Sequence, residues 1–113
     1  MTYLDLTERI NHKVLTLTDR TVGVNLRYDL GLEQLDNSKE PITVLFPTTV
    51  RAIGPNFFFG LFGHSIIRLG KDKFRKHYLF DDPDTPHLRS SIEAGIAEAW
   101  AMGTKPEPDL VET

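Results

Sequence analysis

Alternating and continuous apolar stretches predict four strands in this chain. Residues 14–18 alternate β-branched side chains with leucines, and residues 3–6 alternate apolar with polar ones, as half-buried strands do. Residues 42–46 are almost continuously apolar, which is typical of a central strand covered on both faces. Residues 77–80 form the last short candidate.

A helical period predicts three helices. Residues 21–35 place apolar side chains in two rows and are interpreted as one helix. The second helix covers residues 56–69, with Pro55 well suited to its first position and Gly70 to its C-cap. The third begins after residue 85 and ends at Gly103, while the basic stretch 71–76 is expected to be a connector.

The order of these elements predicts an α/β domain. Strands joined through helices usually lie parallel and close together, so we expect about four strands in one mixed sheet with three helices packed against it. Residues 1–103 should form this single domain. Residues 104–113 contain two prolines and three acidic residues, and are expected to be a flexible acidic tail.

The composition narrows the class of protein. The 113 residues include 13 basic and 16 acidic side chains, for a net charge of −3. Cysteine is absent, which excludes disulfides and thiolate chemistry. No apolar signal-peptide core and no membrane-spanning stretch is present in the sequence, so we expect a cytoplasmic protein that does not bind membranes.

The second helix has more phenylalanine than one sheet can bury. Residues 57–62 contain five large apolar side chains: Phe57, Phe58, Phe59, Leu61 and Phe62. A helix on one sheet needs an apolar stripe somewhat over 100° wide, so one ring should either pack under the last helix or form an exposed partner surface. Gly60 and Gly63 leave part of this helix thin enough to approach a neighbouring backbone.

The stretch 42–100 resembles the STAS-like domain family of unknown function. This family is related to the sulfate-transporter and anti-sigma-factor-antagonist (STAS) superfamily. The resemblance rests on the strand 42–46, the apolar lead 50–53, the phenylalanine-and-glycine helix 56–63 and the closing strand 78–80. No catalytic signature is among these residues.

The resemblance implies an interaction module that binds a protein partner, such as a kinase or another regulator. Related domains bind through the turn between an inner strand and the next helix, and in anti-sigma antagonists a serine of that turn is phosphorylated. Residues 53–56 here contain no hydroxyl group, so we expect binding without a phosphoserine switch. The predicted partner site comprises the following residues: Arg51, Gly54, Pro55, Asn56 and Phe57. Homodimerisation through surplus aromatic surface is a further expectation.

The same turn has a second interpretation. The N–H groups at the start of a helix attract anions, so a phosphate or carboxylate could bind at Gly54, Asn56 and Arg51. An enzyme acting on a phosphorylated small molecule would use such a site. A simple cap and turn explains the same residues.

A basic cluster supplies the alternative function. Its members lie within nine positions: Arg68, Lys71, Lys73, Arg75 and Lys76. Basic side chains around an aromatic such as Phe74 can follow a phosphate backbone, as in a nucleic-acid-associated or defence-related protein. Asp72 interrupts the cluster, and a solvated connector is the better explanation of it, so nucleic acid is not the partner we expect.

No motif for catalysis or cofactor binding stands out. The four histidines lack the short spacing typical of metal ligands, and no serine lies in a Gly-x-Ser-x-Gly elbow. Neither a P-loop nor a dinucleotide-binding fingerprint is present in the sequence. We therefore predict no catalytic residue, no metal and no cofactor, and a protein that is not an enzyme.

Overall fold

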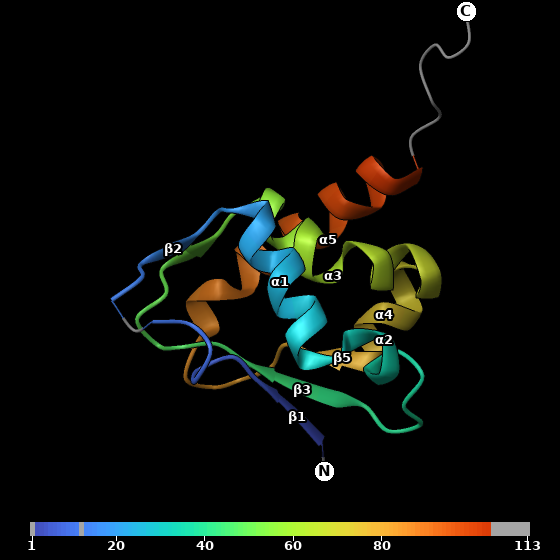
Figure 1. Ribbon diagram of the computed structural model, residues 1–113, viewed down its shortest axis with the longest axis horizontal. Helices are drawn as coiled ribbons and strands as arrows, with labels where there is room; N and C mark the ends of the chain where they lie inside the picture. Colours follow the sequence, from blue (N-terminus) through green and yellow to red (C-terminus); the bar gives the residue numbers. More distant parts are fainter. Residues whose placement is uncertain (1, 12, 105–113) are drawn as a thin grey trace, which may run out of the picture.

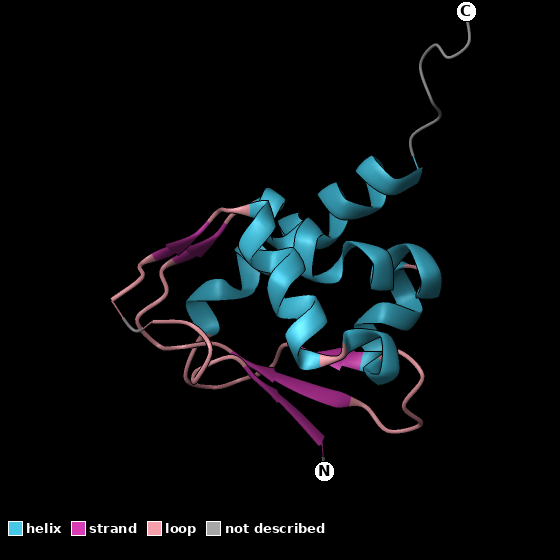
Figure 2. Cartoon of the chain, in the orientation of Figure 1, coloured by secondary structure: helices cyan, strands magenta, loops and turns pink. Residues whose placement is uncertain are grey.

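The computed structural model describes residues 2–11 and 13–104. These residues form an α/β structure in which helices predominate (Figure 2). The predicted tail lies outside the described residues except for Thr104, the last residue of the C-terminal helix.

The strands form two small parallel sheets. The larger contains β1 (Thr2–Asp5), β3 (Ile42–Leu45) and β5 (Tyr78–Leu79), in the order β1-β3-β5. The smaller pairs β2 (Thr16–Leu17) with β4 (Ala52–Ile53). The prediction of one four-stranded mixed sheet is therefore wrong. Every connection between paired strands contains a helix, which brings the chain back in the parallel direction.

Five α-helices and one 3-10 segment occur in the described part of the chain. They are α1 (Arg20–Leu30), α2 (Leu32–Leu35), α3 (Pro55–Leu69), α4 (Lys71–His77), the 3-10 segment Pro86–Leu88 and α5 (Arg89–Thr104). The second predicted helix is confirmed: α3 has Pro55 in its first turn and Gly70 as its C-cap.

The prediction of three helices fails at two places. Gly31 adopts a left-handed conformation, φ 66° and ψ 44°, which ends α1 and starts α2 within the helix predicted over residues 21–35. Residues 71–77 are helical instead of an open connector. The buried ring of Phe74 anchors this short helix, while Lys71, Lys73 and Lys76 remain exposed around it.

Helix α3 lies at the centre of the helical layer and packs against both α1 and α5 (Figure 1). The crossing with α1 is close because it has glycine on both sides. A Cβ atom on Gly60 would lie 2.4 Å from the carbonyl oxygen of Arg20, and one on Gly23 would lie 2.4 Å from that of Phe57. The predicted close approach at Gly60 is confirmed, whereas Gly63 faces the Phe59 ring of its own helix.

The helices cover one face of the larger sheet (Figure 1). Leu4, Ile42 and Val44 point into the core and are at most 3% exposed. Tyr3, on the opposite face of β1, is 54% exposed, and the alternate residues of β3 are half-buried. The prediction that residues 42–46 are covered on both faces is therefore correct for one face only.

The surplus phenylalanine is absorbed by the core. The large buried aromatic side chains are Phe46, Phe57, Phe58, Phe62, Phe74 and Tyr78. Phe58 packs beneath α5, where Gly95 leaves room for its ring. Phe59 is half-buried, and the guanidinium of Arg20 lies 4.6 Å from its ring centroid. Of the two alternatives for the phenylalanine-rich helix, packing of a ring under the last helix is therefore the correct one, and an exposed aromatic surface is not formed by its rings.

Candidate protein-interaction surface

The turn that follows β4 lies beside β2 at one end of the molecule (Figure 1). The Arg51 N–H donates to the carbonyl oxygen of Leu15 at 2.7 Å, and the Gly54 N–H donates to that of Leu17 at 2.6 Å. Gly54 also packs against Thr18, because a Cβ atom there would lie 3.2 Å from the threonine methyl group. The starts of α1 and α3 consequently lie next to each other.

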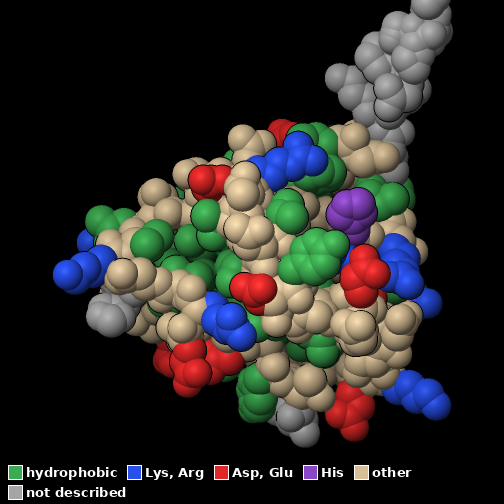
Figure 3. Space-filling view, viewed as in Figure 1, with side chains coloured by type: hydrophobic (Ala, Val, Ile, Leu, Met, Phe, Trp, Pro, Cys, Tyr) green, Lys and Arg blue, Asp and Glu red, His purple; other side chains and the backbone are tan. Residues whose placement is uncertain are grey.

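Two aliphatic side chains are exposed at this end. Leu15, just before β2, is 52% exposed, and Val22, in the first turn of α1, is 42% exposed. Figure 3 shows hydrophobic side chains gathered over β2 and the start of α1, with basic side chains near them. We call this region the β2–β4 surface and define it by its exposed members: Leu15, Val22, Arg51, Pro55 and Asn56.

The structure places four of the five predicted partner residues at or near this surface. Arg51, Pro55 and Asn56 are exposed, and Gly54 is half-buried between them. Phe57 is fully buried, so it is not part of the exposed surface. Its position in the first turn of α3 points the ring inward, beneath the start of α1.

The sequence pattern did not identify Leu15 and Val22. Leu15 and Leu17 lie two positions apart and should share one face of a strand, but Leu17 is 5% exposed and Leu15 lies outside the two paired residues of β2. Val22 belonged to the predicted buried row of a helix. The short length of β2 provides too little alternation to decide which side chains face the core.

The helix ends at this surface differ in their capping. The Asp19 carboxylate accepts a hydrogen bond of 2.8 Å from the Thr21 N–H and so caps α1. Gly54 is the N-cap of α3 and has no side chain to fill that role. The anion interpretation of Gly54, Asn56 and Arg51 stays a prediction.

A small groove adjoins the β2–β4 surface. It lies between residues 9–11, Val14, β2 and the first turn of α1, and has a volume of about 210 Å³. We call it the β2–α1 groove. Ile10, Leu17 and Phe57 form its buried apolar lining, and Val22 lies at its exposed edge.

The basic cluster proposed for nucleic acid is partly engaged within the protein. Arg75 pairs with Glu93 at 2.9 Å, the Lys71 ammonium lies 5.8 Å from the ring centroid of Trp100, and Arg68 lies 3.8 Å from the Asp36 carboxylate. Helix α4 presents the remaining two members, Lys73 and Lys76, which are exposed.

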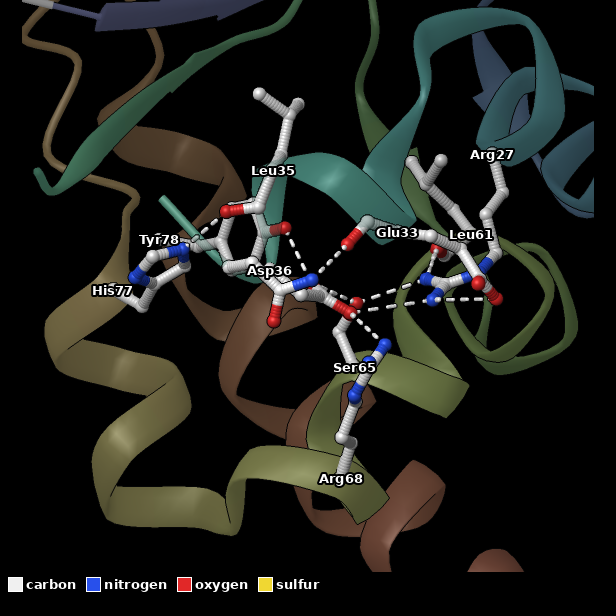
Figure 4. Close-up of polar contacts among 10 residues, drawn as sticks. Arg27, Glu33, Leu35, Asp36, Leu61, Ser65, Arg68, His77 and Tyr78 are labelled. Atoms are coloured by element: carbon white, nitrogen blue, oxygen red, sulfur yellow. Dashed lines mark hydrogen bonds and ion pairs between the residues drawn. The ribbon is translucent and has the colours of Figure 1, made fainter. Parts of the chain in front are cut away.

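A buried polar network lies between α1, the end of α2, α3 and β5 (Figure 4). Its centre is Asp36, at the end of α2, whose side chain has no exposed surface. Ser65 of α3 donates to Oδ1 of this carboxylate at 2.7 Å, and the Tyr78 hydroxyl of β5 donates to the same oxygen at 2.5 Å. Arg27 of α1 places Nη2 3.3 Å from Oδ2. The network therefore joins four elements.

The network brings a carboxylate, hydroxyl groups and a histidine close together. The Asp36 side chain at its centre has no exposed surface, although Arg27 and Tyr78 each form part of the wall of a surface groove. His77 Nε2 lies 2.6 Å from the carbonyl oxygen of Leu35, next to the network. The single hydroxyl hydrogen of Ser65 is committed to Asp36, and its oxygen accepts a hydrogen bond from Arg27 at 2.8 Å. Burial, with the neighbouring Asp36 carboxylate, raises the pKa of Tyr78, so its hydroxyl stays a hydrogen-bond donor. These groups stabilise the fold.

A second groove, the α1–α3 groove, opens where those helices diverge from the Gly23–Gly60 crossing. Its volume is about 440 Å³, within the range of small-molecule sites. Tyr28 is 85% exposed at its edge, and Arg27, Glu33 and His64 are among the polar side chains that line it. The Arg27 guanidinium is already bound to Leu61, Ser65 and Asp36, and this groove has no predominant charge.

Comparisons with known proteins identify no relative: no family model, no curated protein and no solved structure matches this chain. Within residues 2–11 and 13–104, no group of three histidine, cysteine or acidic side chains could hold a metal ion. No helix in the same ranges is long and apolar enough to cross a membrane. The resemblance to STAS-like domains stays a prediction based on the sequence.

Proposed function

We propose that this protein is a non-catalytic regulatory module of STAS-like type, and that it binds a protein partner through the β2–β4 surface. The exposure of Leu15 and Val22 beside the Pro55–Asn56 turn carries the proposal. Exposed aliphatic groups bordered by polar residues are typical of sites that bind other proteins. A kinase or another regulator is the partner that the family resemblance favours.

The rigidity of the surface also supports binding. The β2–β4 pairing and the close Gly23–Gly60 crossing hold the starts of α1 and α3 in place. A surface that is already ordered loses little conformational entropy when it binds. The Asp36 carboxylate is fully buried and already bound to Arg27, Ser65 and Tyr78, so binding accounts for the exposed features better than catalysis does.

Site-specific photo-crosslinking tests this function. A benzophenone amino acid at Asn56 should capture one partner in host cells, and the same group at exposed Lys73, on α4, should not. Val22→Asp should reduce the yield of the Asn56 crosslink, while Lys73→Asp should leave it unchanged. A crosslink between two copies of the chain would identify the partner as a homodimer. Identical products from both labelled positions would contradict the proposal.

No observation favours the nucleic-acid alternative, because three of its five basic residues contact other side chains of the protein. A gel shift at low salt still tests it. Binding that is lost in a Lys73→Glu/Lys76→Glu variant would support the α4 site over the β2–β4 surface.

A further inference from the structure

The segments that build the β2–β4 surface carry a charge opposite to that of the whole chain. Residues 9–22 and 51–56 contain Arg9, Lys13, Arg20 and Arg51, with Asp19 as their single acidic residue. Their net charge is +3, whereas the whole chain carries −3. Positive charge therefore predominates in these segments, even when the adjoining Glu8, which lies near Arg9 and Lys13, is added to the sum.

Most of this positive charge is available to a partner. The Asp19 carboxylate is used to cap α1, and Arg9 has only a long contact of 3.9 Å with exposed Asp29. Within residues 2–11 and 13–104, Lys13 and Arg51 are exposed and take part in no ion pair. Such unneutralised charges steer an oppositely charged partner and stabilise its docked position.

The β2–α1 groove supplies an apolar site within the same region. Its volume of about 210 Å³ and its lining by Ile10, Val14, Leu17 and Val22 suit an aliphatic side chain. Burying one leucine or isoleucine there removes apolar surface from water, which favours association. Arg9 and Asn11 lie on the same groove and place polar groups at its edge.

Resting on the proposed function, we infer that the partner presents an acidic segment with a large aliphatic side chain. Its carboxylates contact Lys13 and Arg51, and the aliphatic side chain enters the β2–α1 groove. Exposed aromatic rings, on which nucleic-acid bases would stack, are not part of this surface: Phe57 is buried, and Arg20 covers Phe59. An acidic protein segment therefore fits the site better than a nucleic acid does.

Fluorescence anisotropy on the full chain tests the inference with synthetic probes. The first probe is an eight-residue peptide with two central leucines between runs of glutamate. Two matched probes replace the leucines by serine or the glutamates by lysine. Only the first probe should bind well. The affinity of the protein for this probe should fall at least tenfold in the Lys13→Glu/Arg51→Glu variant. The same charge change on α4, Lys73→Glu/Lys76→Glu, should alter affinity less than twofold.

Circular dichroism and melting curves establish whether each variant is folded. The milder Lys13→Gln/Arg51→Gln variant, which removes the two positive charges without reversing them, should weaken binding of the first probe by about threefold. Equal effects of both glutamate pairs would overturn the inference, as would equal binding of the lysine probe or no binding of the acidic one. Equally tight binding of single-stranded DNA at this surface would also overturn it. A non-acidic partner crosslinked at Asn56 would leave the proposed function intact and refute only the acidic chemistry.

Discussion

The Tyr78 hydroxyl donates a hydrogen bond of 2.5 Å to Oδ1 of Asp36, which joins an edge strand of the larger sheet to the end of α2. Ser65 donates to the same oxygen, and Arg27 lies beside the other one. One fully buried carboxylate thus organises contacts among α1, α2, α3 and β5. The helices are held in register with the sheet by polar contacts as well as by the apolar core.

Removal of this carboxylate should strongly destabilise the protein. Asp36→Ala leaves the guanidinium of Arg27 buried without its counter-ion, which we expect to lower the free energy of unfolding by about 3–5 kcal/mol. Urea denaturation measures the change. Glu33→Ala is the matched control: this carboxylate lies 4.0 Å from the same guanidinium but is 73% exposed, so its loss should cost less than about 1 kcal/mol. Equal losses in the two variants would contradict the central role of Asp36.

Stability at alkaline pH should depend on Tyr78. Burial and the hydrogen bond to Asp36 raise the pKa of Tyr78 above the value of about 10 expected in the unfolded chain. The phenol's contribution to folding is therefore complete below pH 10 and decreases as pH rises above it, because the unfolded state then ionises more readily. The difference in unfolding free energy between wild type and Tyr78→Phe should shrink from pH 8 to pH 11.

Urea titrations at successive pH values measure this difference, with Tyr28→Phe as the control for removal of an exposed phenol. A Tyr78→Phe profile that runs parallel to wild type across the whole range would show that the buried hydrogen bond does not couple folding to ionisation.

The fold could be predicted from the sequence where local pattern and packing agree. Helix α3 has a proline at its start, a glycine at its end and a continuous apolar face, and its predicted extent is confirmed. The break at Gly31 was missed because the apolar rows continue across it, although backbone conformation stops the helix there. The division into two sheets was missed because β2 and β4 pair over only two residues each.

The buried network could not be predicted from local signals. Arg27, Asp36, Ser65 and Tyr78 are spread over four elements, and each is an ordinary surface residue type by itself. Asp36 begins the polar stretch 36–41, between the helix predicted over residues 21–35 and the strand predicted over residues 42–46. Only the packing of α1, α3 and β5 around it makes the carboxylate buried. Long-range packing, which a single sequence does not reveal, decides the role of such residues.

The crossing of α1 and α3 should not tolerate a methyl group. Alanine at Gly60 favours the helix by about 1 kcal/mol, but its Cβ would lie 2.4 Å from the carbonyl oxygen of Arg20. We expect Gly60→Ala and Gly23→Ala each to destabilise the protein by about 1–3 kcal/mol. The double variant should lose less than the two single losses combined, because one substitution already separates the helices. Thermal denaturation of the three variants tests this, and a fully stable Gly60→Ala would refute the close crossing.

The junction between α1 and α2 should require a left-handed residue. Gly31 has φ 66°, a left-handed conformation in which a Cβ atom raises the energy of the folded state by about 1–2 kcal/mol. Asparagine adopts this conformation more easily than other residues with a side chain. Gly31→Ala should therefore lower the free energy of unfolding by about that amount, and Gly31→Asn by less. Chemical denaturation distinguishes the two variants. Equal stability of wild type and Gly31→Ala would indicate that the helix can continue through this position.

The Arg75–Glu93 ion pair should contribute little to stability. The two groups are 2.9 Å apart, but their side chains are 38% and 55% exposed, so water and salt screen them. A double-mutant cycle with alanine at both positions should give a coupling energy below about 1 kcal/mol, which decreases in 1 M salt. A coupling energy that stays constant with salt would mean that the pair is better shielded than its exposure indicates.

The strand order of the larger sheet imposes a delay on folding during synthesis. β1 leaves the ribosome first, but its partner β3 begins at Ile42, and β5 follows only at Tyr78. Strands that pair across such distances must close long loops before any ladder forms, which slows folding. The middle strand, β3, is the pairing partner of both neighbours, so neither edge strand can pair in this sheet before it. A nascent chain that ends before residue 78 holds Asp36 without its phenol donor, so the polar centre and the sheet are completed together.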